Sequence, residues 1–259
     1  MPFAPVSDPD FQLNVLVQGF PGKSVCHGGL GWSTIALVRR GDRIILVDTG
    51  TFNARHNLHA ELARLGLTPR DVTDVLLTHA HYDHALNWVL FPNARVHIGR
   101  VEMEWAAAFE PGDHMIPELY IQKLKESPQL RLIDDGAEFL PGFRAVRCAG
   151  HTPGCLVFRL AGADRDVLFT GDAAKNRAEL LCRRADMTMD PAVSTASIDR
   201  IRQLWQARAE TLLVPGHDTP MVLEDGAPRY VGTREAGVRA WFGDSIDTTT
   251  LFDFGAVPS

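Results

Sequence analysis

The segment that most constrains this chain is THAHYDH, residues 78–84. It follows the apolar run VTDVLL, which predicts a buried strand. Residues two apart on an extended segment project to the same side, so His79 and His81 are placed to bind one metal ion. If the chain then turns into a helix, Asp83 and His84 at its start face a second ion. Imidazole and carboxylate are ligands that Zn²⁺ accepts.

The alternative interpretation is structural. Single histidines are usually surface or core residues, and Asp83 would then be only a helix N-cap. Three histidines and an aspartate at this spacing are hard to explain in that way, so the metal interpretation is preferred.

Three further segments share one pattern, in which an apolar strand ends in a turn of small residues that carries His or Asp. They are CAGHTPG with His151, LFTGDAA with Asp172 and LLVPGHD with His217. Strand ends of a sandwich converge on one edge, where loops build sites on a rigid scaffold. Each residue alone could be an ordinary turn residue. Together with the first cluster they make seven candidate ligands for two ions.

The rest of the chain predicts strands in each half with helices between them. A helix is expected from Asn53, with Leu58, Leu62 and Leu65 on one face, and another at 194–208, which Ser194 could cap. Residues 110–128 form either an insertion over a site or a surface hairpin that packs Ile116, Leu119 and Leu124 inward. The expected strands are 11–18, 33–38, 43–47, 71–78, 95–98, 143–147, 155–160, 166–170 and 211–214. This pattern predicts an α/β (α+β) fold, a four-layer αββα sandwich, as one domain over residues 1–259.

Composition restricts the partners. The 26 Lys and Arg residues against 32 Asp and Glu give a net charge of -6, and the basic residues are scattered, so no nucleic-acid partner is expected. The N-terminus does not resemble a secretion signal, and no apolar run is long enough for a membrane helix. Four cysteines without Cys-x-x-Cys spacing favour free thiols in the cytoplasm. A small-molecule substrate is the expected partner, and the oligomeric state is left open.

From LVDTG through THAHYDH, AGHTPG and TGDAA to PGHD, the sequence resembles the metallo-β-lactamase superfamily. The match spans most of the chain, and the order and spacing of five motifs make it specific. The resemblance implies two sets of metal ligands, a bridging aspartate and a supporting carboxylate. The first ion would be held by His79, His81 and His151, the second by Asp83, His84 and His217, with Asp172 bridging them and Asp48 beneath the site. Asp48 could equally be an aspartate that closes a strand into a turn.

Such a site performs hydrolysis. Two cations lower the pKa of a shared water, so that hydroxide is available as the nucleophile, and Asp83 is placed as the catalytic residue that shuttles a proton. Two Zn²⁺ ions per chain are expected, with Mn²⁺ or Fe²⁺ as alternatives.

The motifs resemble most closely the lactonases and the glyoxalase II thioesterases, so an ester, lactone or thioester bond of a small metabolite is the expected substrate. Where acyl-homoserine lactonases have a substrate-contacting tyrosine, this chain has AAKNR after the bridging aspartate. Lys175 and Arg177 are therefore candidates for recognising an anionic group, and otherwise solvated charges. His27 and Trp32 either line the pocket or pack a loop. Met187 and Met189 are expected to fill the core or flank the pocket.

Three alternatives remain open. A phosphodiesterase would use the same ligands and the same hydroxide. A mononuclear iron persulfide dioxygenase is suggested by the turn GHTPGC with Cys155, although Asp83, His84 and His217 argue for a second metal. A binding module on an inactive scaffold would be expected to have lost ligands, and all seven are present.

Overall fold

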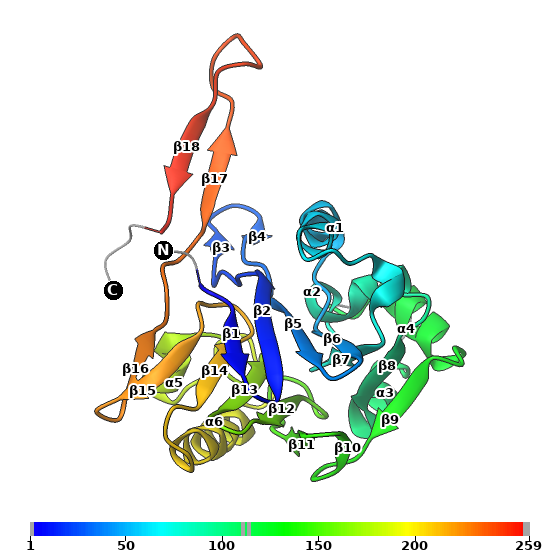
Figure 1. Cartoon of the computed structure of the whole chain (residues 1–259). Helices are drawn as coiled ribbons and strands as arrows, with labels where there is room; N and C mark the ends of the chain where they lie inside the picture. The colour runs from blue at the N-terminus through cyan, green and yellow to red at the C-terminus, as the bar shows by residue number, and fades with distance from the viewer. Residues whose placement is uncertain (1–2, 110–111, 113–114, 256–259) are drawn as a thin grey trace.

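A computed structural model describes residues 3–109, 112 and 115–255. Two seven-stranded sheets pack face to face in this part of the chain (Figure 1). The first has the order β1 (Val6–Asp8), β2 (Phe11–Val17), β5 (Ile35–Arg40), β6 (Arg43–Val47), β7 (Asp74–Leu77), β8 (Arg95–Gly99) and β9 (Leu130–Ile133). The second has the order β10 (Glu138–Leu140), β11 (Phe143–Arg147), β12 (Leu156–Ala161), β13 (Asp166–Gly171), β14 (Leu212–Pro215), β15 (Met221–Glu224) and β16 (Ala227–Tyr230).

Helices cover the outer face of each sheet (Figure 1). Over the first sheet lie η1 (Phe52–Ala54), α1 (Arg55–Arg64), η2 (Pro69–Asp71), α2 (Tyr82–Ala85), η3 (Leu86–Leu90), α3 (Arg100–Ala106) and α4 (Glu118–Lys125). Over the second lie α5 (Arg177–Cys182) and α6 (Pro191–Gln206). The expected αββα layering is therefore confirmed. No helix in the described residues has the length and apolar character needed to cross a bilayer.

Successive side chains along each strand point to opposite faces of the sheet, and this divides the core into layers. On β12, Phe158 faces the space between the sheets with Phe143 and Phe169, whereas Val157 packs outward beneath α6 with Trp205. All five side chains are almost completely buried. Because successive strand residues point to opposite faces, one apolar strand supplies both layers.

Parallel pairing places the metal-ligand candidates at one edge. β6 and β7 run parallel in the first sheet, and β13 and β14 run parallel in the second. Neighbouring parallel strands end at the same edge, so Asp48 follows β6 beside the 78–84 segment that follows β7. Asp172 and His217 follow β13 and β14 in the same way.

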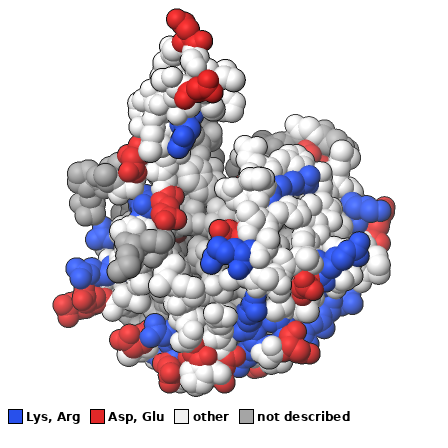
Figure 2. All heavy atoms as spheres, turned by 45° about the horizontal axis from the view of Figure 1, so that its top comes forward, with Lys and Arg blue, Asp and Glu red and all other residues white. Residues whose placement is uncertain are grey.

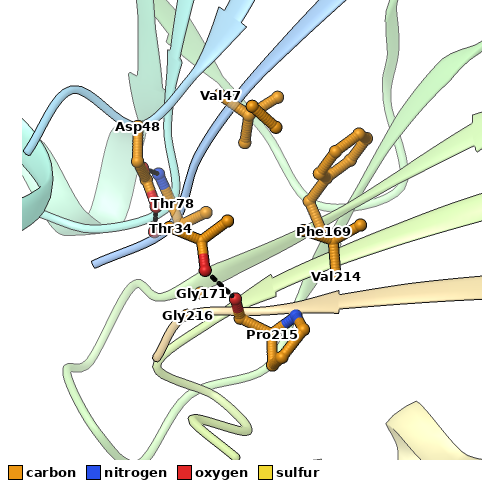
Figure 3. A pocket seen from close by; sticks show the side chains of 10 residues that line it. Thr34, Val47, Asp48, Thr78, Phe169, Gly171, Val214, Pro215 and Gly216 are labelled. Carbon is orange, nitrogen blue, oxygen red and sulfur yellow. Dashed lines mark hydrogen bonds between the residues drawn. The ribbon is translucent and has the colours of Figure 1, made fainter. Parts of the chain in front are cut away.

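The two sheets are tied together directly beneath this edge (Figure 3). The hydroxyl of Thr34 donates to the carbonyl of Pro215 at 2.7 Å, and only a crevice of about 10 Å³ remains between the sheets here. Asp48 and Thr78 line the same crevice. The floor of the site is thus closely packed.

The expected start of the 194–208 helix was wrong. α6 begins at Pro191, and the side chain of Asp190 accepts from the backbone N–H groups of Ala192 and Val193 at 3.0 Å. Proline is favoured in the first turn of a helix, where its missing N–H costs nothing. Ser194 lies inside the helix, buried, and its hydroxyl bonds that of Thr188.

The 110–128 segment contains α4, which buries Leu124, and Ile116 before the helix is also buried. Leu119 was expected to pack inward, but it is 75% exposed because it lies on the outer face of α4. Residues 110–111 and 113–114 of this segment lie outside the described residues.

Nine strands of the described residues were not predicted, namely β1, β9, β10, β15 and β16 of the two sheets and the four strands of two separate hairpins. A short one, β3 (Lys23–Ser24) and β4 (Gly28–Gly29), follows β2. The second, β17 (Gly237–Ala240) and β18 (Thr250–Asp253), extends away from the sandwich (Figure 1). β3 and β4 are only two residues long, and β18 is exposed throughout, so neither hairpin produces a strong hydrophobic pattern.

Candidate metal centre

The seven predicted ligands meet at the shared edge of the two sheets. Their ligand atoms form three overlapping groups, each with all atoms within 4.8 Å of one another. The groups are His79, His81 and His151; His79, His84 and Asp172; and Asp83, His84 and His217. All seven side chains are buried. Residues from four separate loops therefore form one compact cluster.

Asp172 lies between the histidines of both sheets. Its Oδ1 is 3.2 Å from Nε2 of His84 and 3.2 Å from Nε2 of His217, and its Oδ2 is 3.3 Å from Nε2 of His151. Asp83 Oδ2 lies 3.3 Å from the same nitrogen of His217. Asp172 is thus placed to reach both halves of the cluster.

Asp48 orients two of the histidines. Its carboxylate accepts from the backbone N–H and from the hydroxyl of Thr78, each at 2.8 Å. Since the hydroxyl has one hydrogen, its oxygen then accepts from Nδ1–H of His79 at 3.1 Å. Asp48 Oδ2 also accepts from Nδ1–H of His84 at 2.8 Å. In their neutral forms both imidazoles therefore present an Nε2 lone pair to the cluster.

The backbone of Asp48 has a φ of +56°, which is uncommon for a residue with a Cβ. Such conformations cost of order 1–3 kcal/mol and concentrate at functional sites. The contacts of the carboxylate with Thr78 and His84 explain why the chain tolerates it here.

His151 is fixed by a backbone group. Its Nδ1–H donates to the carbonyl of Met187 at 2.9 Å, and its Nε2 lies 2.9 Å from Nδ1 of His81. Nε2 of His79 is buried and has no hydrogen-bond partner among the residues that the structure describes. A buried unpartnered nitrogen costs free energy unless something binds it. The residues present thus fit a bound cation.

The two halves of the cluster differ in charge. Burial lowers the pKa of His79 well below its usual range, that of His81 to about 4 and that of His151 to about 3. These three imidazoles are neutral at pH 7, as metal ligation requires.

Burial also acts against the charged form of His84 and His217, but the neighbouring carboxylates outweigh it. Asp83 and Asp172 raise the pKa of His84 well above its usual range and that of His217 to about 9. Burial acts to raise the pKa of Asp83, but His84 and His217 together outweigh it. The pKa of Asp83 is therefore lowered to about 2. His84 and His217 thus form ion pairs with Asp83 and Asp172 in this half of the cluster.

A pocket of about 680 Å³ opens beside the cluster, and we call it the polar pocket because Lys23, Lys175, Asn176 and Asp186 are among the residues that line it. Lys175 lines it, with its ammonium 3.0 Å from Glu179 Oε1. Lys23 of the β3–β4 hairpin forms an ion pair with Asp186 across the same pocket. The other lining residues are Pro21, Gly22, Gly28, Gly29, Gly31, Tyr82, Asp83, Met115, His151, Asp172, Met187 and His217.

A second pocket of about 400 Å³ adjoins the cluster and is largely apolar. Met115, His151 and Met187 line both pockets. The remaining walls of the apolar pocket are His81, Trp105, Phe109, Ile116, Thr188 and Met189. Met187 and Met189 thus flank the pockets and are not core residues, since they are 56% and 58% exposed.

The structure brings only one of the four suggested substrate contacts to a pocket. Lys175 lines the polar pocket, as described above. Arg177 instead donates from Nε to the carbonyl of Pro228 and lies over the ring of Tyr230. His27 is exposed, with its backbone N–H bonded to the Ser24 hydroxyl.

Trp32 donates its indole N–H to the carbonyl of Gln18 and packs on Phe20. Its loop does contribute to the polar pocket, but through Lys23 and glycines.

Sequence analysis missed Glu102 of α3. This fully buried carboxylate accepts from the Ala80 N–H at 2.9 Å, the Thr152 hydroxyl at 2.8 Å and the Gly154 N–H at 3.0 Å. A single glutamate within a helical segment carries no signal that distinguishes it from a surface charge, so the sequence alone offered no means of finding it.

Residues 28–217 match the family described as the Metallo-beta-lactamase superfamily. The chain belongs to this superfamily. The match begins in the β3–β4 hairpin and ends at His217, so it includes all seven clustered side chains.

Relatives and solved structures agree with this placement. The chain is 27% identical over 158 residues to the N-acyl homoserine lactonase AiiA of Bacillus thuringiensis subsp. kurstaki, which is 61% of this chain and 60% of that protein. It is 47% identical over 204 residues to the human Metallo-beta-lactamase domain-containing protein 1, which is 74% of this chain and 64% of that one. Each alignment thus spans less than two thirds of the relative.

Among solved structures, a metallo-β-lactamase-like protein of Thermotoga maritima has a TM-score of 0.66 at 25% identity, over 83% of this chain and 100% of that one. The dizinc quorum-quenching lactonase AidC, solved with a product, has a TM-score of 0.72 at 19% identity. That comparison covers 90% of this chain and 98% of AidC, and it supports the fold.

Proposed function

We propose that this protein is a metal-dependent hydrolase that uses two metal ions to cleave an ester, lactone or thioester bond of a small metabolite. The observation that carries the proposal is the convergence of five imidazoles and two carboxylates, all buried, beside two adjoining pockets. Buried charged and polar groups in such number are costly unless they bind something.

The assignment of ligands follows the three groups. His79, His81 and His151 would hold one ion, Asp83, His84 and His217 the other, and Asp172 would contact both. Nitrogen and oxygen donors in this ratio suit Zn²⁺, with Mn²⁺ or Fe²⁺ as alternatives. When bound, such a pair supplies Lewis acidity and a water molecule acidic enough to be a nucleophile near neutral pH.

Asp83 is the proposed proton carrier. Its carboxylate lines the polar pocket, and its low pKa keeps it ionised at pH 7. Oδ2 lies 3.3 Å from Nε2 of His217 and 3.5 Å from Nε2 of His84, so the carboxylate is held at the cluster rather than in solvent. It is positioned to accept a proton from an attacking water and return it to a leaving group in the pocket.

The two pockets support an amphiphilic substrate. The apolar pocket, with Trp105 and Met189 in its walls, suits an acyl or aryl group on the carbonyl side of the bond. The polar pocket, with Lys175 and Asn176, suits the alcohol or thiol part. The lactonase relatives are named for acyl homoserine lactones, which have this division into an apolar chain and a polar ring.

Three observations favour an acyl substrate over the alternatives. The pocket lysines Lys23 and Lys175 are each paired with a carboxylate, so little uncompensated positive charge faces a phosphodiester. Lys and Arg are interspersed with Asp and Glu on the face seen in Figure 2. Cys155, which prompted the persulfide alternative, is completely buried in the core beside Cys148, away from both pockets.

A cytoplasmic setting is part of the proposal. Its support is the state of the four cysteines, which are all free in the described structure. Disulfides form readily in oxidising compartments and are rare in a reducing cytoplasm.

A hydrolysis screen on zinc-loaded protein tests the proposed reaction. It would cover lactones, thioesters, aryl esters, β-lactams and bis-p-nitrophenyl phosphate, with Asp172→Asn as the inactive variant. Asp166→Asn is the matched control, because Asp166 is equally buried but lies at the opposite end of β13, between Arg159 and Arg208. Hydrolysis of the phosphodiester with inertness to every acyl compound would overturn the proposal.

Acyl-chain length tests the apolar pocket separately. Each methylene buried contributes about 0.8 kcal/mol, so kcat/KM should rise roughly fourfold for each added methylene until the pocket is filled. Trp105→Ala should reduce the increase of kcat/KM with acyl-chain length, and the variant should still hydrolyse an acetyl ester. A chain-length profile identical in the variant would show that the acyl group binds elsewhere.

A further inference from the structure

Glu102 has contacts that set it apart from Asp74 and Asp166, which are also buried carboxylates outside the metal cluster. Asp74 and Asp166 each face arginine side chains, whereas the three bonds described for Glu102 come from two backbone N–H groups and a hydroxyl. Burying a carboxylate is costly, and these bonds lack the charge of a cationic partner to offset that cost. Its placement therefore calls for an explanation beyond helix packing.

We propose that Glu102 is a positioning residue that holds the three-histidine half of the metal cluster in its binding geometry. The inference rests on the proposed metal site. The three bonds described for Glu102 come from residues beside the ligands rather than from the ligand side chains, so it acts through the segments that carry them.

The three donors lie within the two loops that carry these histidines. Ala80 stands between His79 and His81, at the end of the first sheet, and its N–H donates to Oε1 of Glu102. Thr152 directly follows His151, at the end of a strand of the second sheet, and donates to Oε2. One carboxylate thus connects the two loops across the gap between the sheets.

The helix approaches these loops closely enough to require a glycine. A Cβ on Gly154 would lie 2.2 Å from the backbone nitrogen of Glu102. The third bond, from the Gly154 N–H to Oε2 at 3.0 Å, depends on this approach. The sequence therefore combines an acidic residue on α3 with a small residue in the His151 loop.

A carboxylate suits this junction better than a neutral side chain. In its ionised form its two oxygens accept all three hydrogen bonds, because it then has no hydrogens of its own. A glutamine has one oxygen and an NH₂ group, so at least one buried N–H would lose its acceptor. Losing an acceptor costs about 1–3 kcal/mol at a buried site, and here the loss falls on the loops that carry His79, His81 and His151.

Metal titration of the metal-free protein tests the inference. Zn²⁺ binding would be followed by calorimetry and by competition with a chelator, in wild type, Glu102→Gln and the milder Thr152→Val. Mutations of groups that orient metal ligands typically cost 10–100-fold in affinity. We expect Glu102→Gln to weaken one of the two binding events by that factor and to leave the other unchanged, with a smaller loss in the same event for Thr152→Val.

Double variants identify which half is affected. Glu102→Gln should add little to the loss caused by His151→Ala, because both act on the same ion, and should add fully to the loss caused by His217→Ala. Asp166→Asn is the control for a general loss of stability, and it should bind both ions as wild type does.

The outcomes separate the two proposals. Two wild-type affinities in Glu102→Gln, even with a lower melting temperature, would show that Glu102 only stabilises the fold and would overturn this inference. Equal weakening of both Zn²⁺-binding events in Glu102→Gln would also overturn this inference. Absence of metal binding in wild type would instead refute the proposed function.

Discussion

Asp48 shows how one side chain sets the chemistry of another. It accepts the Nδ1 hydrogen of His84, which leaves Nε2 of that ring free for a metal ion. In Asp48→Asn the amide group can face Nδ1 and favour the other tautomer. We expect the affinity for the second ion to fall 10–100-fold, measured by zinc titration.

Asp74→Asn is the matched control for this change. Asp74 also accepts from a buried imidazole, that of His97 at 2.8 Å, but it lies at the start of β7, away from the cluster. It should therefore leave both zinc affinities unchanged. Unaltered zinc binding in Asp48→Asn would contradict the account of Asp48.

Glu102 also makes stability depend on pH. Burial raises its pKa from 4.5 to about 7, so the folded state holds this proton more tightly than the unfolded state does. Its ionisation destabilises the fold as pH rises from 4.5 to 7. Since each pKa unit is worth about 1.4 kcal/mol, the effect approaches about 3 kcal/mol.

The Glu102→Gln side chain cannot ionise, so the variant should not lose stability in this way. The free energy of unfolding of the variant minus that of wild type should therefore increase as pH rises from 4.5 to 7. Urea unfolding of both metal-free proteins at pH 5, 6 and 7.5 measures the difference. A difference that stays constant across these values would show that Glu102 does not titrate there.

At the level of residues, the sequence could predict which side chains form the cluster, but it could not predict the contacts that orient them. THAHYDH and the three small-residue turns carry their chemistry in a short pattern, and the structure brings their side chains together. Arg177 and Lys175 are two positions apart, yet only Lys175 reaches the pocket. Such differences depend on rotamers and tertiary contacts, for example the stacking of Arg177 on Tyr230, which no local pattern records.

At the level of elements, the contact between α3 and the His151 loop makes a prediction. An alanine at Gly154 places a methyl group against the backbone of Glu102 and forces the helix outward. Overpacking of this kind typically costs 1–3 kcal/mol, which denaturant unfolding would measure. Gly243→Ala is the control, because a Cβ there meets nothing within 4 Å. Equal stability of the two variants would mean that the contact is loose.

Elements with a strong apolar pattern could be predicted closely. The strands expected at 43–47 and 143–147 match β6 and β11. The start of α6 could not be placed, because Asp190 and Ser194 are both residues that cap helices and only the position of Pro191 favours the first. Edge strands such as β16 lack a complete pattern because much of their surface faces solvent.

At the level of the whole molecule, the αββα arrangement follows from apolar strands that bury both faces. The single domain over residues 1–259 stays a prediction, and the β17–β18 hairpin lies outside the sandwich that motivated it (Figure 1). The pocket walls come from many separate segments that include the β3–β4 hairpin and the loop with Met187. Their assembly depends on long-range packing, so the substrate pockets could not be predicted from the sequence.

The central claim is that the seven side chains together hold two metal ions. Anomalous diffraction from zinc-soaked crystals tests it most directly. We expect two peaks about 3.5–4 Å apart, one among His79, His81 and His151 and the other among Asp83, His84 and His217. A map with no anomalous peak among these residues would contradict the account.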